Sequence, residues 1–342
     1  MRDRKQCFTM RIASFLCLLV FILKPANAEI YQWNQFVYSA LDLVMNQEYD
    51  SAYNICDRRI AADSMDIDAR YLKLVILQSQ LADYESYALD GLRCISMAEN
   101  LLKCLDIRLN TCSSSLEKQK ILFFKGNIFG ILSIVKVKRG SILLGIKDAR
   151  TSYENFKKLS NSSTLFPDVL YGIGLFDYYI GDNLKWIPGI GKRARSGLEM
   201  LLTASKSESP FRFGAKSSLL WILIERGDFT AADSIANEVL KEYPDNTVFF
   251  QAKSRAAFGA QQYQKAMELG EKLIELSLKR KVINWSDVLS GYQLIASCHL
   301  KMGNRKKAQD IADKGLSYDI QADTLKIEWV QKHRNFLMSI AE

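Results

Sequence analysis

The sequence predicts an all-α protein built as a solenoid of antiparallel helix pairs. Three observations support this class: the spacing of apolar residues, the positions of the prolines and an internal repeat. Apolar residues recur at intervals of three and four, as in Leu269, Leu273 and Leu276, and the alternating runs typical of half-buried strands are absent. After residue 28 the prolines fall where helices are expected to end.

A 34-residue repeat is clearest in two consecutive copies. Gly227–Ala232 and Gln261–Ala266 both place an aromatic residue three positions before an alanine, and a small residue, Ala236 or Gly270, follows four positions later. A helix–turn–helix unit of this length cannot bury its apolar face alone, so it must stack on neighbouring units.

The first 28 residues are expected to form a secretory signal peptide. A basic start precedes a 12-residue, largely apolar run (Ile12–Leu23), and Ala26 and Ala28 mark a cleavage site that would leave Glu29 first. A membrane span needs ~20 apolar residues; an uncleaved anchor, which Lys24 slightly favours, is the alternative. We therefore expect an exported protein, periplasmic if the host is bacterial and secreted otherwise.

Charge does not favour a nucleic-acid partner. The chain carries 46 basic and 38 acidic side chains, a formal net charge of +8. The expected signal peptide holds five of the basic residues and one acidic residue, which leaves 41 against 37, or +4, in the remainder. This weak balance predicts no nucleic-acid partner.

Residues 29–164 are expected to form an N-terminal helical repeat region. One copy of the repeat spans 33–66, where Gln47, Glu48 and Tyr49 precede Ala52. Longer, degenerate helix pairs are expected after it, over 67–82, 84–109, 116–138 and 141–159. Residues 165–342 are expected to form a C-terminal region with copies at 213–277 and 288–318. The step from Ala266 to Ala308 is 42 residues, so about eight extra residues near 279–287 should lengthen a helix or loop.

The residues that recur at equivalent positions of these copies, which we call repeat columns, resemble the tetratricopeptide repeat (TPR). The resemblance implies a right-handed superhelix with degenerate N-terminal repeats and a concave face that binds a protein or peptide. Aromatic residues sixteen positions before the anchor alanines, Phe36, Phe250 and Tyr292, are the candidates for this concave face. The predicted groove is lined by the inward helices, near Asn34–Leu43, Lys216–Leu223, Phe250–Ala257 and Tyr292–His299.

The segment 165–199 departs from the repeat. Aromatic residues crowd an expected helix at 165–180, and a glycine-rich, basic loop follows at 181–197, with Lys185, Trp186, Lys192, Arg193 and Arg195. Such a loop could hold an anion at a helix N-terminus. It is not a P-loop, because Arg193 rather than a hydroxyl residue follows Lys192. A tight repeat-linking turn with solvated cations, an anion or lipid-headgroup contact, and a partner contact all remain open.

Residues 165–205 also resemble a segment of the eukaryotic TPR proteins linked to clearance of inclusion bodies and lipid droplets, and of their bacterial relatives. The pattern includes Tyr171, Gly172 and Gly174, then Trp186 to Pro188, and Gly197. This resemblance implies an interaction protein and brings no catalytic residues with it.

Motifs for catalysis, metal binding or cofactor binding are missing from the sequence, so no such site and no enzyme activity is predicted. Of the two histidines, His299 falls in a packing column and His333 is expected to be exposed. Five cysteines follow residue 28, so at least one should be unpaired; Cys104 and Cys112 could meet across a turn, and Cys56 fits a buried small-residue column.

These observations together predict a non-enzymatic interaction scaffold or adaptor in the cell envelope. The alternative is a lipid- or anion-binding envelope protein that uses the aromatic helix 165–180 and the basic loop 185–195, with peripheral membrane contact. The sequence leaves the partner and the oligomeric state open.

Overall fold

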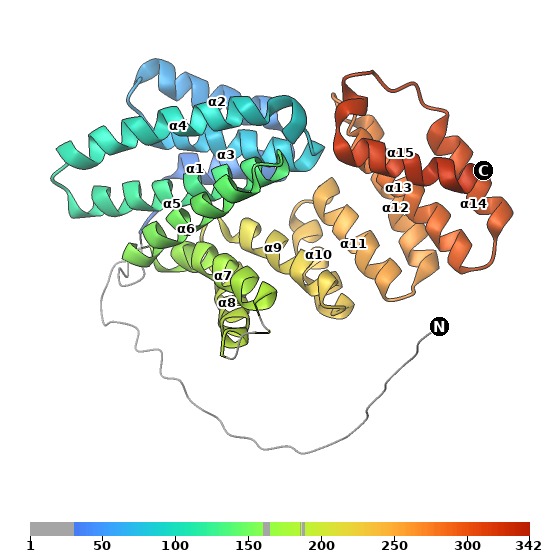
Figure 1. Ribbon diagram of the computed structural model, residues 1–342. Helices are drawn as coiled ribbons and strands as arrows, with labels where there is room; N and C mark the ends of the chain where they lie inside the picture. Colours follow the sequence, from blue (N-terminus) through green and yellow to red (C-terminus); the bar gives the residue numbers. More distant parts are fainter. Residues whose placement is uncertain (1–30, 160–164, 185, 187–188) are drawn as a thin grey trace.

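The protein is all-α, as a computed structural model shows (Figure 1). The structure describes residues 31–159, 165–184, 186 and 189–342; the expected signal peptide and Lys185 lie outside them. Within these residues there are fifteen α-helices, one 3-10 turn, η1 (Thr324–Lys326), and no strands. The helices are α1 (Gln35–Met45), α2 (Tyr49–Ala62), α3 (Ile67–Tyr84), α4 (Tyr87–Thr111), α5 (Ser115–Lys138), α6 (Ile142–Leu159), α7 (Phe166–Asn183), α8 (Gly191–Ser205), α9 (Arg212–Glu225), α10 (Phe229–Glu242), α11 (Thr247–Gly259), α12 (Tyr263–Lys279), α13 (Trp285–Lys301), α14 (Arg305–Leu316) and α15 (Glu328–Ala341).

Helices α1 to α14 form seven pairs, and α15 packs on the last pair. We call the first helix of each pair the A helix and the second the B helix. Each turn from A to B contains one residue with a left-handed backbone, with φ between 52° and 86°. Glycine adopts this conformation without steric strain, and four of the seven positions are glycine. The seven residues are Gln47, Glu85, Gly140, Gly189, Gly227, Gln261 and Gly303.

Polar side chains begin many of the A helices. Each accepts a hydrogen bond from a backbone N–H three residues later, which satisfies one donor that the helix itself leaves unpaired. These caps are Asn34 on α1, Asp66 on α3, Ser114 on α5, Asn246 on α11 and Asn284 on α13. The loops from one B helix to the next A helix, which we call B–A loops, are therefore rich in Asn, Asp and Ser.

The predicted repeat columns form the contacts between helices. Ala52, Ala232, Ala266 and Ala308 are fully buried, and so is Cys56 in its small-residue column. A helices pack on neighbouring A helices as well as on B helices, so they form the inner layer of the curved stack. The all-α, TPR-like stacking of helix pairs is confirmed.

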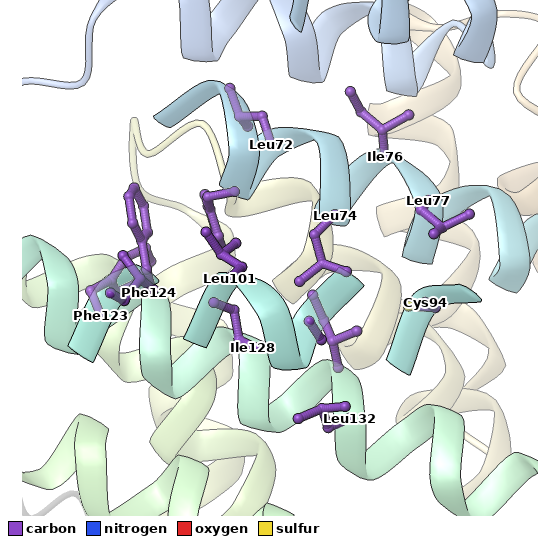
Figure 2. Packing of buried hydrophobic residues seen from close by; sticks show 14 of the residues in the cluster. Leu72, Leu74, Ile76, Leu77, Cys94, Leu101, Phe123, Phe124, Ile128 and Leu132 are labelled. Atoms are coloured by element: carbon purple, nitrogen blue, oxygen red, sulfur yellow. The ribbon is translucent and has the colours of Figure 1, made fainter. Parts of the chain in front are cut away.

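The long helices of the N-terminal region form the largest apolar core. Figure 2 shows side chains from α3, α4 and α5 meeting there, with Leu74 and Leu101 facing Ile128. The bounds of α3 to α6 agree within three residues with the four helices expected from the sequence. The eight extra residues of the 42-residue step make α12 three residues longer than α10, α13 four longer than α11, and the loop between α12 and α13 one longer.

Segments that are about 200 positions apart in the sequence contact each other. Tyr243 Oη donates to Asp42 Oδ1 at 2.9 Å, and Asn246 Nδ2 donates to the Met45 carbonyl at 2.7 Å, both across 201 positions. One pair later, Arg280 binds Asp83 across 197 positions. The A–B turns of pairs one and two thus lie against the B–A loops that follow pairs five and six. The superhelix completes a turn, and its second turn stacks on the first.

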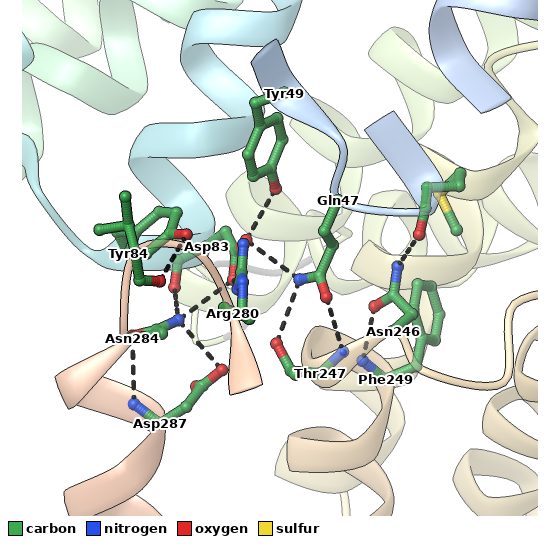
Figure 3. Close-up of polar contacts among 12 residues, drawn as sticks. Gln47, Tyr49, Asp83, Tyr84, Asn246, Thr247, Phe249, Arg280, Asn284 and Asp287 are labelled. Carbon is green, nitrogen blue, oxygen red and sulfur yellow. Dashed lines mark hydrogen bonds and ion pairs between the residues drawn. The ribbon is translucent and has the colours of Figure 1, made fainter. Parts of the chain in front are cut away.

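We call this contact between the two superhelical turns the junction. A buried polar cluster forms its centre (Figure 3). Asp83 accepts from Arg280 Nη1 at 3.0 Å, from Arg280 Nη2 at 2.7 Å and from Tyr49 Oη at 2.8 Å. Asn284 Nδ2 donates to the Asp83 carbonyl at 2.8 Å, and Gln47 bridges Asp83 and Thr247. Arg280 and Asn284 lie in the lengthened α12–α13 loop, so the irregular step in the repeat supplies the junction.

A second contact between distant segments surrounds Trp33. Its ring lies 5.5 Å from Phe123 and 5.1 Å from Phe211, centroid to centroid, and its Nε1 donates to Asp168 Oδ2 at 2.9 Å. Ser209 also donates to Asp168. Burial raises the pKa of Asp168 to about 6, although the hydrogen bonds from Ser209 and Trp33 oppose the rise. The N-terminal ends of several A helices are thereby held together.

Candidate functional site

The three aromatic residues predicted for the concave face differ in their exposure and contacts. Tyr292 is buried, and its hydroxyl lies 3.0 Å from that of Tyr318. Phe36 is partly buried under the Arg59 guanidinium, 4.3 Å from the ring centroid, and Phe250 is also partly buried.

A polar row lies on α11, α13 and α15, and two of the ranges predicted for the groove include three of its five residues. Gln251 and Arg255 stand four positions apart on one face of α11, and Ser290 and Gln293 stand three apart on α13. His333 of α15 completes the row, with its Nδ1 against Gln293 Oε1. We call these five residues the inner polar row.

Arg255 is the charged centre of this row. Its Nη2 donates to Ser290 Oγ at 3.0 Å, and Gln251 Nε2 donates to the same oxygen at 3.5 Å. Among the described residues, no carboxylate forms an ion pair with Arg255. Burial lowers the pKa of the guanidinium. A guanidinium that is withdrawn from water and has no carboxylate partner favours the binding of an anionic group from another molecule.

His333 corrects one expectation from the sequence, because it is buried rather than exposed. Its neighbours in sequence are polar, but α15 turns this side chain toward α13. Burial, followed by the charges of Arg255 and Lys332, lowers the pKa of His333 to about 3. The ring is therefore neutral at physiological pH. The residues predicted from the sequence were the aromatic residues at one position of the repeat, and not the inner polar row. The sequence feature that indicates the row is the four-residue spacing of Gln251 and Arg255 within an otherwise largely apolar helix.

The residues of the predicted basic loop fall into separate environments. Arg193 binds Asp177 and lies over the rings of Phe176 and Tyr153, so its charge is compensated within the fold. Trp186 is 77% exposed, and Lys192 and Arg195 are exposed on the first turns of α8. Lys185 lies outside the described residues.

The aromatic helix α7 is largely a packing element. Tyr178 is buried, Tyr171 shares a hydrogen bond with Ser218, and Phe176 stacks on Tyr153 at 4.4 Å. Glycines let α7 and α8 approach closely: a Cβ on Gly197 would lie 2.4 Å from the backbone nitrogen of Tyr178. Gly174, Gly181 and Gly197 therefore serve helix packing, and Gly189 serves the turn between α7 and α8.

The five cysteines are free thiols, including Cys104 and Cys112. In the described part of the chain no cluster of three or more His, Cys, Asp or Glu side chains is placed to hold a metal ion. No described helix is long and apolar enough to cross a membrane.

This chain is similar to proteins of known structure, whereas no family model and no curated protein matches it. The C-terminal part of a TPR repeat-containing protein from Cytophaga hutchinsonii is 14% identical, covering 85% of this chain and 99% of that one, with a TM-score of 0.37. A tetratricopeptide repeat protein from Parabacteroides merdae is 13% identical, with coverages of 89% and 97% and a TM-score of 0.40. Yeast Tom70 is 9% identical, with coverages of 89% and 88% and a TM-score of 0.32. By its own repeat columns and seven helix pairs, this chain is a TPR-like α-solenoid.

Proposed function

We propose that this protein is an exported, non-enzymatic scaffold that binds an acidic segment of a partner protein on its inner polar row. The observation that carries the proposal is Arg255, a cation withdrawn from water with a hydroxyl partner and no ion-paired carboxylate in the described chain. A guanidinium presents its donors in a planar fork that matches a carboxylate. Gln251 and Gln293 add neutral donors and acceptors beside it.

The scaffold role is supported by the architecture behind this row. Helix pairs that are locked to each other at the junction hold α11, α13 and α15 in fixed positions. A preorganised row loses little conformational entropy when a ligand binds. Export is supported by the basic start, apolar run and small-residue cleavage site of the first 28 residues. Sequencing the N-terminus of the protein from its native host tests export, and Glu29 as the first residue is the expected result.

The binding proposal is tested by crosslinking in native cells followed by mass spectrometry. We compare the wild type with Arg255→Gln, which keeps a donor for Ser290 and removes the charge. Lys253→Gln, on the same helix two positions away, is the matched control. Loss of a buried charge partner costs about 2–5 kcal/mol, so affinity should fall at least about 30-fold in Arg255→Gln and stay near wild type in Lys253→Gln. Crosslinks that map elsewhere and survive Arg255→Gln would contradict the proposal.

A second candidate function is contact with anionic lipid headgroups at the α7–α8 turn. The observation in its favour is the exposed Trp186 beside the exposed Lys192 and Arg195, since tryptophan and cations favour a membrane interface. Lys192→Glu with Arg195→Glu should abolish cosedimentation with phosphatidylglycerol vesicles. Unchanged cosedimentation, or none in the wild type, contradicts this candidate.

A further inference from the structure

A pocket of about 460 Å³ opens among α2, α3 and α4, in the first two helix pairs. None of its lining residues belongs to the junction or to the inner polar row. Pockets that hold small ligands typically have volumes of ~300–1,000 Å³. This pocket therefore has room for a small organic molecule, and the chemistry of its lining decides which kind.

One part of the lining is apolar. Ile60 comes from the end of α2, and Met97 and Leu101 stand four positions apart on one face of α4. Leu101 is buried, whereas Ile60 and Met97 are half-buried and still present apolar surface. An apolar group placed over them would remove that surface from water, which favours binding.

A second part of the lining is cationic. Arg70 and Lys73 stand three positions apart on α3, and Arg93 reaches the pocket from α4. In the part of the chain that the structure describes, no Asp or Glu lines the pocket. Lys73 forms an ion pair with Asp57, whose side chain is 51% exposed. Within the same residues no ion pair is formed by Arg70 or Arg93, so two guanidinium groups line the pocket without a carboxylate partner.

This arrangement of charge suits an anionic ligand. Like charges three positions apart on a helix repel each other, and an apolar wall beside them strengthens the repulsion unless an anion lies near them. Arg70 Nε donates to the Ser64 carbonyl at 2.8 Å, which holds its guanidinium in place. Guanidinium groups bind phosphate and carboxylate oxygens through paired N–H donors. Ser96 and Asn100, four positions apart on α4, add a hydroxyl and an amide to the same pocket.

We infer that this pocket binds a small amphiphilic anion. Arg70 and Arg93 bind its phosphate or carboxylate group, and Ile60 and Met97 contact its apolar part. An inorganic anion lacks the apolar contact, and an uncharged alcohol lacks the ion pairs, so the pocket selects a molecule that has both. The site lies on other helices than the inner polar row, so the inference does not depend on partner binding there.

The test is isothermal titration calorimetry of the purified protein with hexyl phosphate, which joins an anionic group to a short alkyl chain. We expect a single site, with inorganic phosphate and hexanol binding at least about tenfold more weakly. Arg70→Gln with Arg93→Gln should weaken hexyl phosphate binding at least about tenfold, because hydrogen bonds to a charged group are lost. Lys301→Gln with Lys307→Gln removes the same net charge at exposed positions of α13 and α14 and should bind as the wild type does.

A further variant separates the two parts of the pocket. Met97→Asn should weaken the binding of hexyl phosphate and leave that of inorganic phosphate unchanged, because it alters the apolar contact alone. Urea unfolding of each variant is measured alongside. Arg93→Gln alone, at an exposed position, should also weaken hexyl phosphate binding, which keeps the test decisive if Arg70→Gln affects the fold.

Several results overturn the inference. These are a wild type that does not bind hexyl phosphate in the millimolar range, equal weakening in the two double variants, or inorganic phosphate that binds as tightly as hexyl phosphate. Cosedimentation with phosphatidylglycerol vesicles distinguishes the source of the ligand. Cosedimentation that is lost in Arg70→Gln with Arg93→Gln would indicate a lipid in a membrane, whereas hexyl phosphate binding without such cosedimentation would indicate a free molecule.

Discussion

Asp83 and Arg280 face each other across the junction, and the guanidinium donates to both carboxylate oxygens, at 3.0 and 2.7 Å. The Asp83 side chain is 1% exposed and that of Arg280 is 12% exposed. Burial, and then the charge of Asp83, raises the pKa of the neighbouring Asp287. The junction therefore holds two buried carboxyl groups beside one cation, and Arg280 compensates the charge of Asp83.

Removing Arg280 should strongly destabilise the protein. Arg280→Met leaves Asp83 buried without its cation, which costs about 3–5 kcal/mol when one partner of a buried pair is lost. The free energy of unfolding in urea measures the effect. Lys281→Met is the matched control, because Lys281 binds Asp50 across the same boundary with 86% and 70% exposure. An exposed pair contributes about 0–1 kcal/mol, so equal losses in the two variants would contradict the role given to the junction.

Trp33 should contribute through both its ring and its hydrogen bond. Trp33→Phe keeps most of the aromatic packing but leaves Asp168 without one donor, which should cost about 1–3 kcal/mol. Trp33→Ala also opens a cavity between Phe123 and Phe211, and large-to-small changes of this kind cost about 3–5 kcal/mol. Thermal and urea unfolding would rank the three proteins. A Trp33→Phe variant as unstable as Trp33→Ala would show that packing contributes little.

Two helical glycines should respond in opposite directions to alanine. Gly197→Ala places a Cβ 2.4 Å from the Tyr178 backbone nitrogen, so α7 and α8 must separate. Overpacking typically costs about 1–3 kcal/mol. Gly130→Ala finds only Ser152 Oγ at 3.5 Å, and alanine in an open helical position stabilises by about 0.5–1 kcal/mol. Urea midpoints shifted in the same direction for both variants would contradict the close packing.

Acid should destabilise the C-terminal region through His333. Its pKa is about 3 in the fold and near 6.5 when unfolded, so the unfolded chain binds the extra proton. Stability is fully present above pH 6.5 and falls as the pH drops toward 3, by up to about 2 kcal/mol between pH 6.5 and 5. His333→Gln should remove this part of the pH dependence. The raised pKa of Asp168 acts in the opposite direction but is common to both proteins, so their difference isolates His333.

The local parts of this fold follow from the sequence, and its long-range contacts do not. Ala232 and Ala266 mark helix contacts because close packing requires a small residue at a fixed point of each unit. The bounds of α3 to α6 followed from apolar spacing without a clear repeat. No such sequence pattern predicts the contact between Asp83 and Arg280. This contact depends on the small rotations between successive helix pairs, summed over several pairs.

The candidate site was predicted only in outline. The ranges given for the inward helices included Arg255 and Gln293, whereas the residues chosen within them were the aromatic Phe36, Phe250 and Tyr292, of which Tyr292 is buried. His333 seemed exposed because its sequence neighbours are polar, whereas its burial depends on how α15 packs on α13. Which side of a helix faces inward depends on the curvature of the whole stack, and local periodicity does not give that curvature.

Asp83 and Arg280 are 197 positions apart in the sequence, and their contact at the junction affects how the chain folds and how it tolerates truncation. Repeat proteins normally tolerate the loss of terminal units, because each unit contacts only its neighbours. A chain cut after residue 242 would keep five complete pairs yet lose Arg280 and Asn284, two of the residues that bind Asp83 at the junction. During synthesis Asp83 must likewise wait for a segment made much later, and such distant contacts slow folding. The solenoid therefore behaves as one cooperative unit rather than as a row of independent modules.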